Sequence, residues 1–195
     1  MYSQRHPTSD ECPSQLEELP CFTGKIRVYH SATAQFYAPS DLCRAGGMYR
    51  ELIRSTPSWY GSLRRDTTFV SLDDAPGMRG MQIACVHLFF SFQDPYLDRE
   101  FPCALVSWFV CIDEEPDGDT GMWIVSPERE GCSPTSPLTL QVIHLKSIAR
   151  GTHLLPVYGS SFLPEDFPFM MALDCFEKYF VNKFADHHAH QFLAD

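Results

Sequence analysis

The chain has 195 residues, of which 44% are hydrophobic and 21% are charged, the balance of an ordinary globular protein. Its eight cysteines are too few for a disulfide-stabilised scaffold, and its net charge of −10 argues against a general polyanion binder. No apolar leader follows Met1, and no apolar run approaches the length of a membrane-spanning helix. These features predict an intracellular protein with one domain and no membrane partner.

The first third of the chain combines a polar lead with short strand patterns. Residues 1–22 are rich in Ser, Pro, Glu and Asp, which predicts a disordered lead or linker. Residues 25–30 alternate polar and apolar side chains as a half-buried strand does, and 34–38 suit a second short strand. We expect a helical stretch at 48–54, ended by Pro57.

The middle of the chain has the pattern of consecutive β-strands. Residues 101–112 are apolar on both faces, which is typical of a central strand. The acidic loop 113–119 lies between this strand and the next pattern, which makes a hairpin plausible. The full set of strand patterns in this part of the chain is 67–72, 81–92, 101–112, 120–125, 138–145 and 154–158.

The pattern changes near the C-terminus. Apolar residues recur there at steps of four, three, four and four, at Phe169, Leu173, Phe176, Phe180 and Phe184. This spacing predicts one amphipathic helix at about 168–190, packed against the sheet. The fold class is therefore mainly β (α+β): a small antiparallel β-barrel or curled sheet with a C-terminal amphipathic helix, in a single domain at 23–192.

Basic residues are concentrated in one part of the sequence. Residues 23–65 hold seven basic residues against two acidic ones, together with several aromatic residues. Basic and aromatic side chains together provide phosphate contacts and base stacking in nucleic-acid grooves. The candidate nucleic-acid residues are Arg50, Arg54, Trp59, Tyr60, Arg64 and Arg65. The alternative is an ordinary solvated segment whose aromatic residues belong to the core.

A second candidate surface would bind a basic peptide. The loop 113–119 packs five acidic residues into seven positions, and aromatic residues at strand positions flank it. Aromatic rings with an acidic residue can enclose a methylated ammonium group. The candidate peptide-binding residues are Trp108, Phe109, Asp113, Glu114, Glu115, Asp117, Asp119 and Trp123. The alternatives are a solvated turn for the acids and core packing for the aromatic rings.

The third candidate is a metal site near the C-terminus. His187 and His190 are three residues apart, and Asp186 and His190 are four apart, so either pair shares one face of a helix. The sequence identifies no further ligands, and a polar helix end is the alternative. No cofactor is expected, although zinc is possible at this cluster.

Several segments carry a resemblance to proteins encoded by fungal transposons. The segments include Lys25–Leu42, Asp119–Val125, His153–Gly159 and Tyr179–His190. Together they resemble the C-terminal region of Plavaka-type and KDZ-type transposon proteins of mushroom-forming fungi. The catalytic transposase core of that group is not in this chain.

A second likeness concerns the order of the strands. The succession from Asp66–Val70 to His153–Val157, with an acidic loop in its middle, is similar to a bromo-adjacent homology (BAH) domain. That family is a β-barrel that binds nucleosomes, histone tails or partner proteins. The resemblance implies that Trp108, Phe109 and Trp123 lie at a recognition surface.

The resemblances imply a non-catalytic, transposon-derived interaction module that acts in the nucleus on chromatin, DNA or a partner protein. Two alternatives stay open. One is a metal-dependent enzyme using Asp186, His187 and His190, and the other is a degenerate fragment without activity. The sequence contains no Walker A loop, GxGxxG, GxSxG or HExxH motif that would name a reaction.

Overall fold

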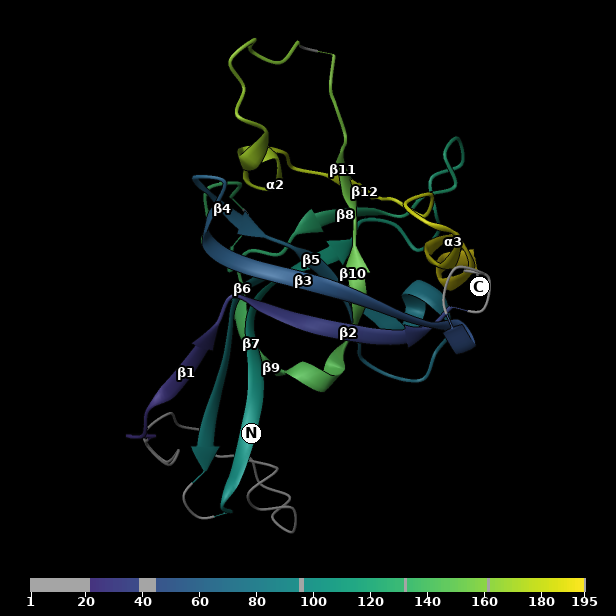
Figure 1. The fold of residues 1–195 in the computed structure, drawn as a ribbon. Helices are drawn as coiled ribbons and strands as arrows, with labels where there is room; N and C mark the ends of the chain where they lie inside the picture. The colour runs from purple at the N-terminus through teal and green to yellow at the C-terminus, as the bar shows by residue number, and fades with distance from the viewer. Residues whose placement is uncertain (1–21, 39–44, 95–96, 132, 161, 195) are drawn as a thin grey trace.

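The computed structural model describes residues 22–38, 45–94, 97–131, 133–160 and 162–194 (Figure 1). Its strands are β1 (Ile26–Tyr29), β2 (Ser31–Tyr37), β3 (Met48–Trp59), β4 (Ser62–Arg65), β5 (Thr67–Ser71), β6 (Met81–Asp94), β7 (Arg99–Cys111), β8 (Ile124–Pro127), β9 (Leu140–His144), β10 (Ile148–Thr152), β11 (Leu154–Pro156) and β12 (Tyr179–Val181). The helices are α2 (Ala172–Cys175) and α3 (His187–Ala194), with 3₁₀ turns at Ala45–Gly47, Gly77–Gly80, Leu145–Ser147 and Phe169–Met171.

The larger of two sheets is built around the long hairpin of β6 and β7. Its strand order is β10-β5-β6-β7-β8-β12-β11, while β1 pairs with β6 and β9 pairs with β7. The two ends of this order, β10 and β11, follow each other in the chain with one residue between them, so the sheet is nearly closed into a barrel. The prediction of a mainly β fold with an antiparallel barrel or curled sheet is confirmed.

The smaller sheet contains β2, β3 and β4 and crosses in front of the main sheet in Figure 1. β2 pairs with β3 along its whole length, and β3 then pairs with β4 through a tight turn. Both β2 and β3 pack against β10 of the main sheet. The long β6–β7 hairpin extends away from this crossing, with β1 alongside it.

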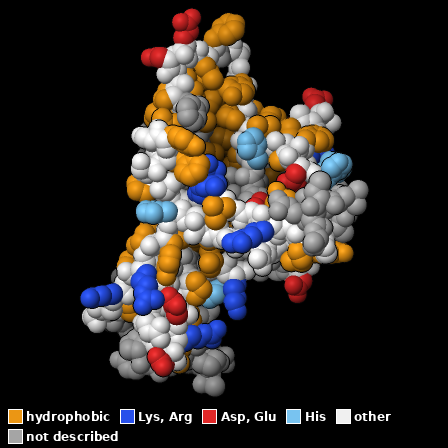
Figure 2. Space-filling view, viewed as in Figure 1, with side chains coloured by type: hydrophobic (Ala, Val, Ile, Leu, Met, Phe, Trp, Pro, Cys, Tyr) orange, Lys and Arg blue, Asp and Glu red, His pale blue; other side chains and the backbone are white. Residues whose placement is uncertain are grey.

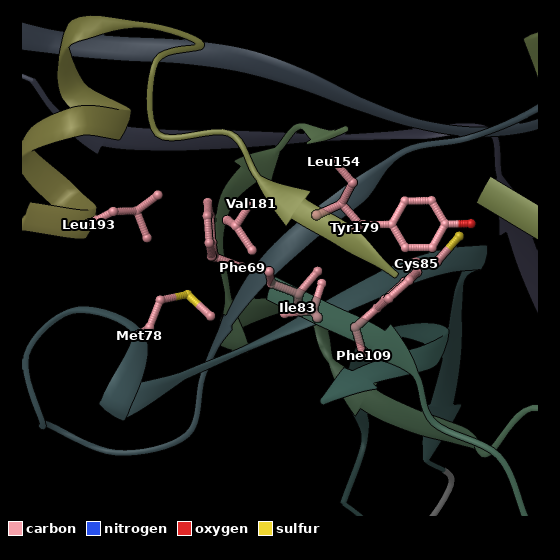
Figure 3. Close-up of a cluster of buried hydrophobic side chains, with 10 residues drawn as sticks. Phe69, Met78, Ile83, Cys85, Phe109, Leu154, Tyr179, Val181 and Leu193 are labelled. Atoms are coloured by element: carbon pink, nitrogen blue, oxygen red, sulfur yellow. The ribbon is translucent and has the colours of Figure 1, made fainter. Parts of the chain in front are cut away.

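Two apolar cores lie on opposite faces of the main sheet. The first is shown in Figure 3 and contains Phe69, Met78, Ile83, Cys85, Phe109, Val125, Leu154, Tyr179, Val181 and Leu193. The second lies toward the small sheet and contains Ala34, Ile53, Val70, Ala84, Val86, Phe89, Ala104, Val106 and Trp108. Because successive side chains of a strand point to opposite faces, neighbours such as Phe69 and Val70 enter different cores. This arrangement explains why β7 is apolar on both faces.

The helix predicted at 48–54 is wrong. These residues form the first half of β3, in which Ile53 is buried while Arg50 and Leu52 are exposed. Met, Glu, Leu and Arg favour a helix locally, but pairing with β2 and burial of one face decide the outcome. Pro57 does not end the element, because it lies in β3 where the pairing with β4 shifts, and a bulge tolerates the missing N–H.

The single amphipathic helix predicted at 168–190 is also wrong. The segment contains a 3₁₀ turn, the short α2 and the strand β12, and α3 begins only at His187. Tyr179 and Val181 are fully buried in β12, which pairs with β8 and β11 and completes the barrel-like sheet. Phe184, a member of the predicted apolar stripe, is 62% exposed. Burial in the sheet therefore overrides the helical spacing.

The predicted lead at 1–22 lies outside the described residues except for Phe22.

Substitutions in this segment distinguish the strand from the predicted helix. Val181→Ala removes two buried methyl groups from the barrel and is expected to lower the free energy of unfolding by about 2 kcal/mol. Phe184→Ala changes an exposed ring and is expected to alter it by less than about 0.5 kcal/mol. Urea denaturation of both variants measures the difference. A larger loss for Phe184→Ala than for Val181→Ala would contradict this placement of the C-terminal segment.

Candidate functional site

The hairpin of β3 and β4 brings together most of the residues predicted to contact nucleic acid. Trp59 pairs with Ser62, so the turn between the strands contains only Tyr60 and Gly61. Both have positive φ, 49° and 84°, which is the geometry of tight hairpin turns whose twist matches the strands. Glycine adopts this geometry freely, but a bulky tyrosine rarely does. The side chain of Tyr60 is 94% exposed, so the turn presents an aromatic ring to solvent.

Two guanidinium groups lie over the Trp59 ring beside this turn. The Cζ atom of Arg54 is 4.6 Å from the ring centroid and that of Arg64 is 4.9 Å from it. Such cation–π contacts hold the arginine side chains against the hairpin. The Trp59 and Tyr60 rings meet edge to face, with centroids 5.2 Å apart. The four residues therefore form one cluster of two cations and two aromatic rings, which we call the hairpin cluster.

The predicted arginines differ in how strongly acidic residues engage them. Arg64 donates to Asp66 at 2.7 Å, and Arg65 donates to both carboxylate oxygens of Asp174 at 2.8 and 2.6 Å. Arg50 is exposed on β3, and the guanidinium group of Arg54 lies over the Trp59 ring. Arg50 and Arg54 are consequently the more available cations for a phosphate group.

Two further basic residues of the positive segment, Lys25 and Arg27, lie elsewhere. Lys25 precedes β1 and Arg27 is in β1, at the far end of the molecule from the β3–β4 turn (Figure 1). Figure 2 shows that Lys and Arg side chains on this face are dispersed among hydrophobic ones rather than gathered in one patch. The basic character of residues 23–65 is therefore divided between two places on the surface.

The aromatic residues of the predicted peptide surface are not together. Trp108 and Phe109 are neighbours in β7 and point to opposite faces, with exposures of 5% and 3%, into the second and first cores. The Trp108 indole N–H donates to the Gln141 side-chain oxygen at 2.8 Å. Trp123 is partly buried against the first core. The predicted recognition surface of three aromatic rings is wrong, because core packing takes two of them out of solvent.

The acidic loop is a solvated turn. Asp113, Glu114 and Glu115 are exposed. Asp117 accepts hydrogen bonds from the Thr120 hydroxyl at 2.7 Å and the Thr120 N–H at 2.9 Å, and these bonds lower the pKa of its carboxyl. Asp117 thus shapes the turn, while the other acids are free to act through charge alone.

The C-terminal cluster is organised around an arginine. The Asp186 carboxylate accepts hydrogen bonds from Arg150 at 2.5 and 3.2 Å and from the Ala189 N–H at 2.6 Å, as a helix cap does. His187 is exposed, and the ring centroid of His190 lies 5.9 Å from that of Phe184. Within the described ranges, no three His, Cys, Asp or Glu side chains are grouped as ligands of one metal ion.

A cleft of about 420 Å³ lies between the small sheet and β10, and sequence reasoning missed it. Its lining includes Glu51, Ile53, Arg64, Arg65, Asp66, Arg150, Gly151, Thr152, Leu154, Leu173 and Asp186. The Glu51 carboxylate accepts a hydrogen bond from the Gly151 N–H, a contact between residues 100 positions apart in the chain. The local signal in the sequence is one acidic residue, Glu51, in a basic segment, while Arg150 lies between the predicted strands 138–145 and 154–158.

The chain matches no family model, no curated protein and no solved structure. None of the helices that the structure describes is long and apolar enough to cross a membrane.

The pairing of Asp186 with Arg150 predicts a pH-dependent stability. Burial alone raises the pKa of the Asp186 carboxyl, but hydrogen bonds from Arg150 and Ala189 outweigh it and lower the pKa. The stabilisation is therefore present above the ordinary value of 3.8 and is lost as the pH falls through the lowered folded pKa. Asp186→Asn is expected to destabilise the fold by about 2 kcal/mol at pH 7, because it leaves the buried Arg150 without its carboxylate.

Urea denaturation between pH 2 and pH 7 measures this effect. The difference between the unsubstituted protein and Asp186→Asn is expected to shrink as the pH falls below about 4. His187→Asn is the control, since this side chain is exposed, and it should leave the stability unchanged at pH 7. Equal effects of the two substitutions would contradict the role given to Asp186.

Proposed function

We propose that this chain is a non-catalytic binding module that contacts DNA through the hairpin cluster of Arg54, Trp59, Tyr60 and Arg64. The observation that carries the proposal is the exposed Tyr60 ring at the β3–β4 turn, next to Trp59 and the two guanidinium groups that lie over it. Aromatic rings stack on bases and arginines bind phosphate, so the cluster has both contacts of a nucleic-acid site. A role in the nucleus and an origin in a transposon belong to this proposal and follow from the resemblances.

The net charge of −10 limits what kind of binding the proposal allows. A protein of this charge is repelled by DNA at long range, so affinity must come from local contacts. Within the hairpin cluster, Arg64 is also held by Asp66, so Arg54 is the arginine that a phosphate group reaches without competing with a carboxylate. We therefore expect modest affinity, and a preference for single-stranded DNA, whose bases are free to stack on Tyr60.

The alternative partner is a basic histone tail, bound by a BAH-like barrel. It has less support, because Trp108 and Phe109 are buried. The acidic residues at 113–115 are exposed and contribute charge, but the buried Trp108 and Phe109 rings cannot form an aromatic cage beside them. Binding to nucleosomes in the absence of binding to free DNA would favour this alternative.

Fluorescence anisotropy with labelled single-stranded and duplex 20-mers, across a salt series, tests the proposal. The double variant Arg54→Glu/Arg64→Glu is expected to weaken binding and to reduce the slope of log K against log salt by about one to two. Lys25→Glu/Arg27→Glu is the matched control: it makes the same change in net charge on two exposed residues at the other end of the molecule. The control should change binding much less.

A second substitution isolates the stacking contact. Tyr60→Asn removes the ring but tolerates the left-handed backbone, and it is expected to weaken single-stranded DNA binding about tenfold. Tyr158→Ala removes another exposed tyrosine, 61% accessible, and should have no effect. Equal losses in the two double variants, or no loss on replacement of Tyr60, would overturn the assignment of DNA binding to the hairpin.

A further inference from the structure

Among the charged residues that line the cleft between the small sheet and β10, Glu51 is a carboxylate whose hydrogen bond goes to the backbone rather than to an arginine. The arginines of the cleft are each paired with an acidic side chain, in the pairs Arg64–Asp66 at 2.7 Å, Arg65–Asp174 at 2.6 Å and Arg150–Asp186 at 2.5 Å. Glu51 also lines the cleft, and its carboxylate accepts a hydrogen bond from the backbone N–H of Gly151. The lining thus holds three arginines and three carboxylates, Glu51, Asp66 and Asp186, while Arg65 is paired with Asp174 outside the lining.

The surroundings of Glu51 disfavour its charged form. Burial is the largest influence and raises the pKa of its carboxyl above the ordinary value, while the Gly151 N–H and the Arg150 guanidinium act in the opposite direction. Asp186 and Asp66 raise it further by repulsion. A half-buried carboxylate whose nearby arginine is already shared with another acidic side chain is stabilised when a further cation arrives.

The wall beside this carboxylate is apolar. Ile53 and Leu154 are buried, with exposures of 2% and 8%, and Leu173 is half-buried, and all three line the cleft. A charged end next to a hydrocarbon surface matches a ligand that has an aliphatic stem and a cationic head. The cleft, at about 420 Å³, is within the size range of small-ligand sites.

We propose that this cleft binds an alkylammonium group, of the kind a lysine side chain carries, with its ammonium on Glu51 and its methylenes against Ile53, Leu154 and Leu173. The group belongs either to a free amine or to a lysine of another protein, and the recognition chemistry is the same. The proposal is independent of DNA binding, because none of these four residues belongs to the hairpin cluster.

A second observation supports a ligand with hydrogen-bond donors. Thr152, which also lines the cleft, has a buried hydroxyl oxygen for which the described residues provide no hydrogen-bond partner. It follows Gly151, whose N–H holds Glu51. Buried polar groups are almost always hydrogen-bonded, and an ammonium group has three donors to give. The structure thus has an unsatisfied acceptor in the residue that follows the Gly151–Glu51 contact.

Two-dimensional NMR titration of the whole chain with Nα-acetyl-lysine methylamide, whose side-chain ammonium is free, tests the proposal. The chemical shifts of the Gly151 and Thr152 amides are expected to change with ligand concentration until the site is saturated. N-acetyl-norleucine methylamide has a similar stem without the charge and is expected to bind at least tenfold more weakly. An Ala-Lys-Ala peptide with blocked ends is the second arm: tighter binding than the single residue assigns the site to a protein lysine, and equal or weaker binding assigns it to a free amine.

Glu51→Gln keeps the acceptor for Gly151 but removes the charge, and it is expected to weaken lysine binding at least tenfold. Glu100→Gln makes the same chemical change on an exposed residue of β7 and should leave binding unchanged. If Glu51→Gln does not fold, Glu51→Asp retains the charge one methylene shorter and should bind several-fold more weakly. Equal binding of the lysine and norleucine compounds, or full binding by Glu51→Gln or Glu51→Asp, would overturn the proposal. Arg54→Glu should not affect lysine binding, which separates this result from the test of DNA binding.

Discussion

The buried guanidinium of Arg150 connects parts of the chain that are far apart in sequence. It lies in β10 of the main sheet with only 4% of the residue exposed, and it binds Asp186 just before α3. Its Cζ atom is 4.8 Å from the centroid of the Phe36 ring in β2, and its Nη1 atom is 2.7 Å from His188 Nδ1. A buried cation requires such partners, because its desolvation costs several kcal/mol when it is left unpaired. The main sheet, the small sheet and the C-terminal helix must therefore meet at this point.

The cleft lies where the two sheets meet at Arg150. The small sheet crosses the main sheet rather than lying flat on it, and β3 reaches β10 through the Glu51–Gly151 hydrogen bond. Around that contact the lining contains ion-paired side chains and apolar ones, from β3, β4, β10 and β11. The cleft and the hairpin cluster are adjacent, since Arg64 belongs to both. A ligand in the cleft would therefore lie close to a ligand on the hairpin cluster.

Burial decided which of the aromatic residues are available for recognition. From the sequence, Trp108 is a candidate recognition residue with core packing as the alternative; the structure shows that it fills the second core and that its N–H donates to Gln141. Tyr60, in contrast, is held outside by a two-residue turn that has no room for a core beneath it. The difference comes from the number of strands that pack over each position, which composition does not reveal.

The sequence by itself determined the mainly β fold, since alternation and apolar runs mark β5, β6, β7 and β9 with bounds close to those observed. It also determined the charge asymmetry. Arg54, Trp59, Tyr60 and Arg64 could be named as candidates from the sequence because they lie within eleven positions of each other. Only the tertiary structure decided that 48–54 is a strand and that Tyr179–Val181 completes the barrel, because in both places pairing and burial outweigh a helical pattern. Only the tertiary structure placed Glu51 beside Arg150 and Gly151, because a contact across 100 residues depends on how the two sheets cross and leaves no local pattern.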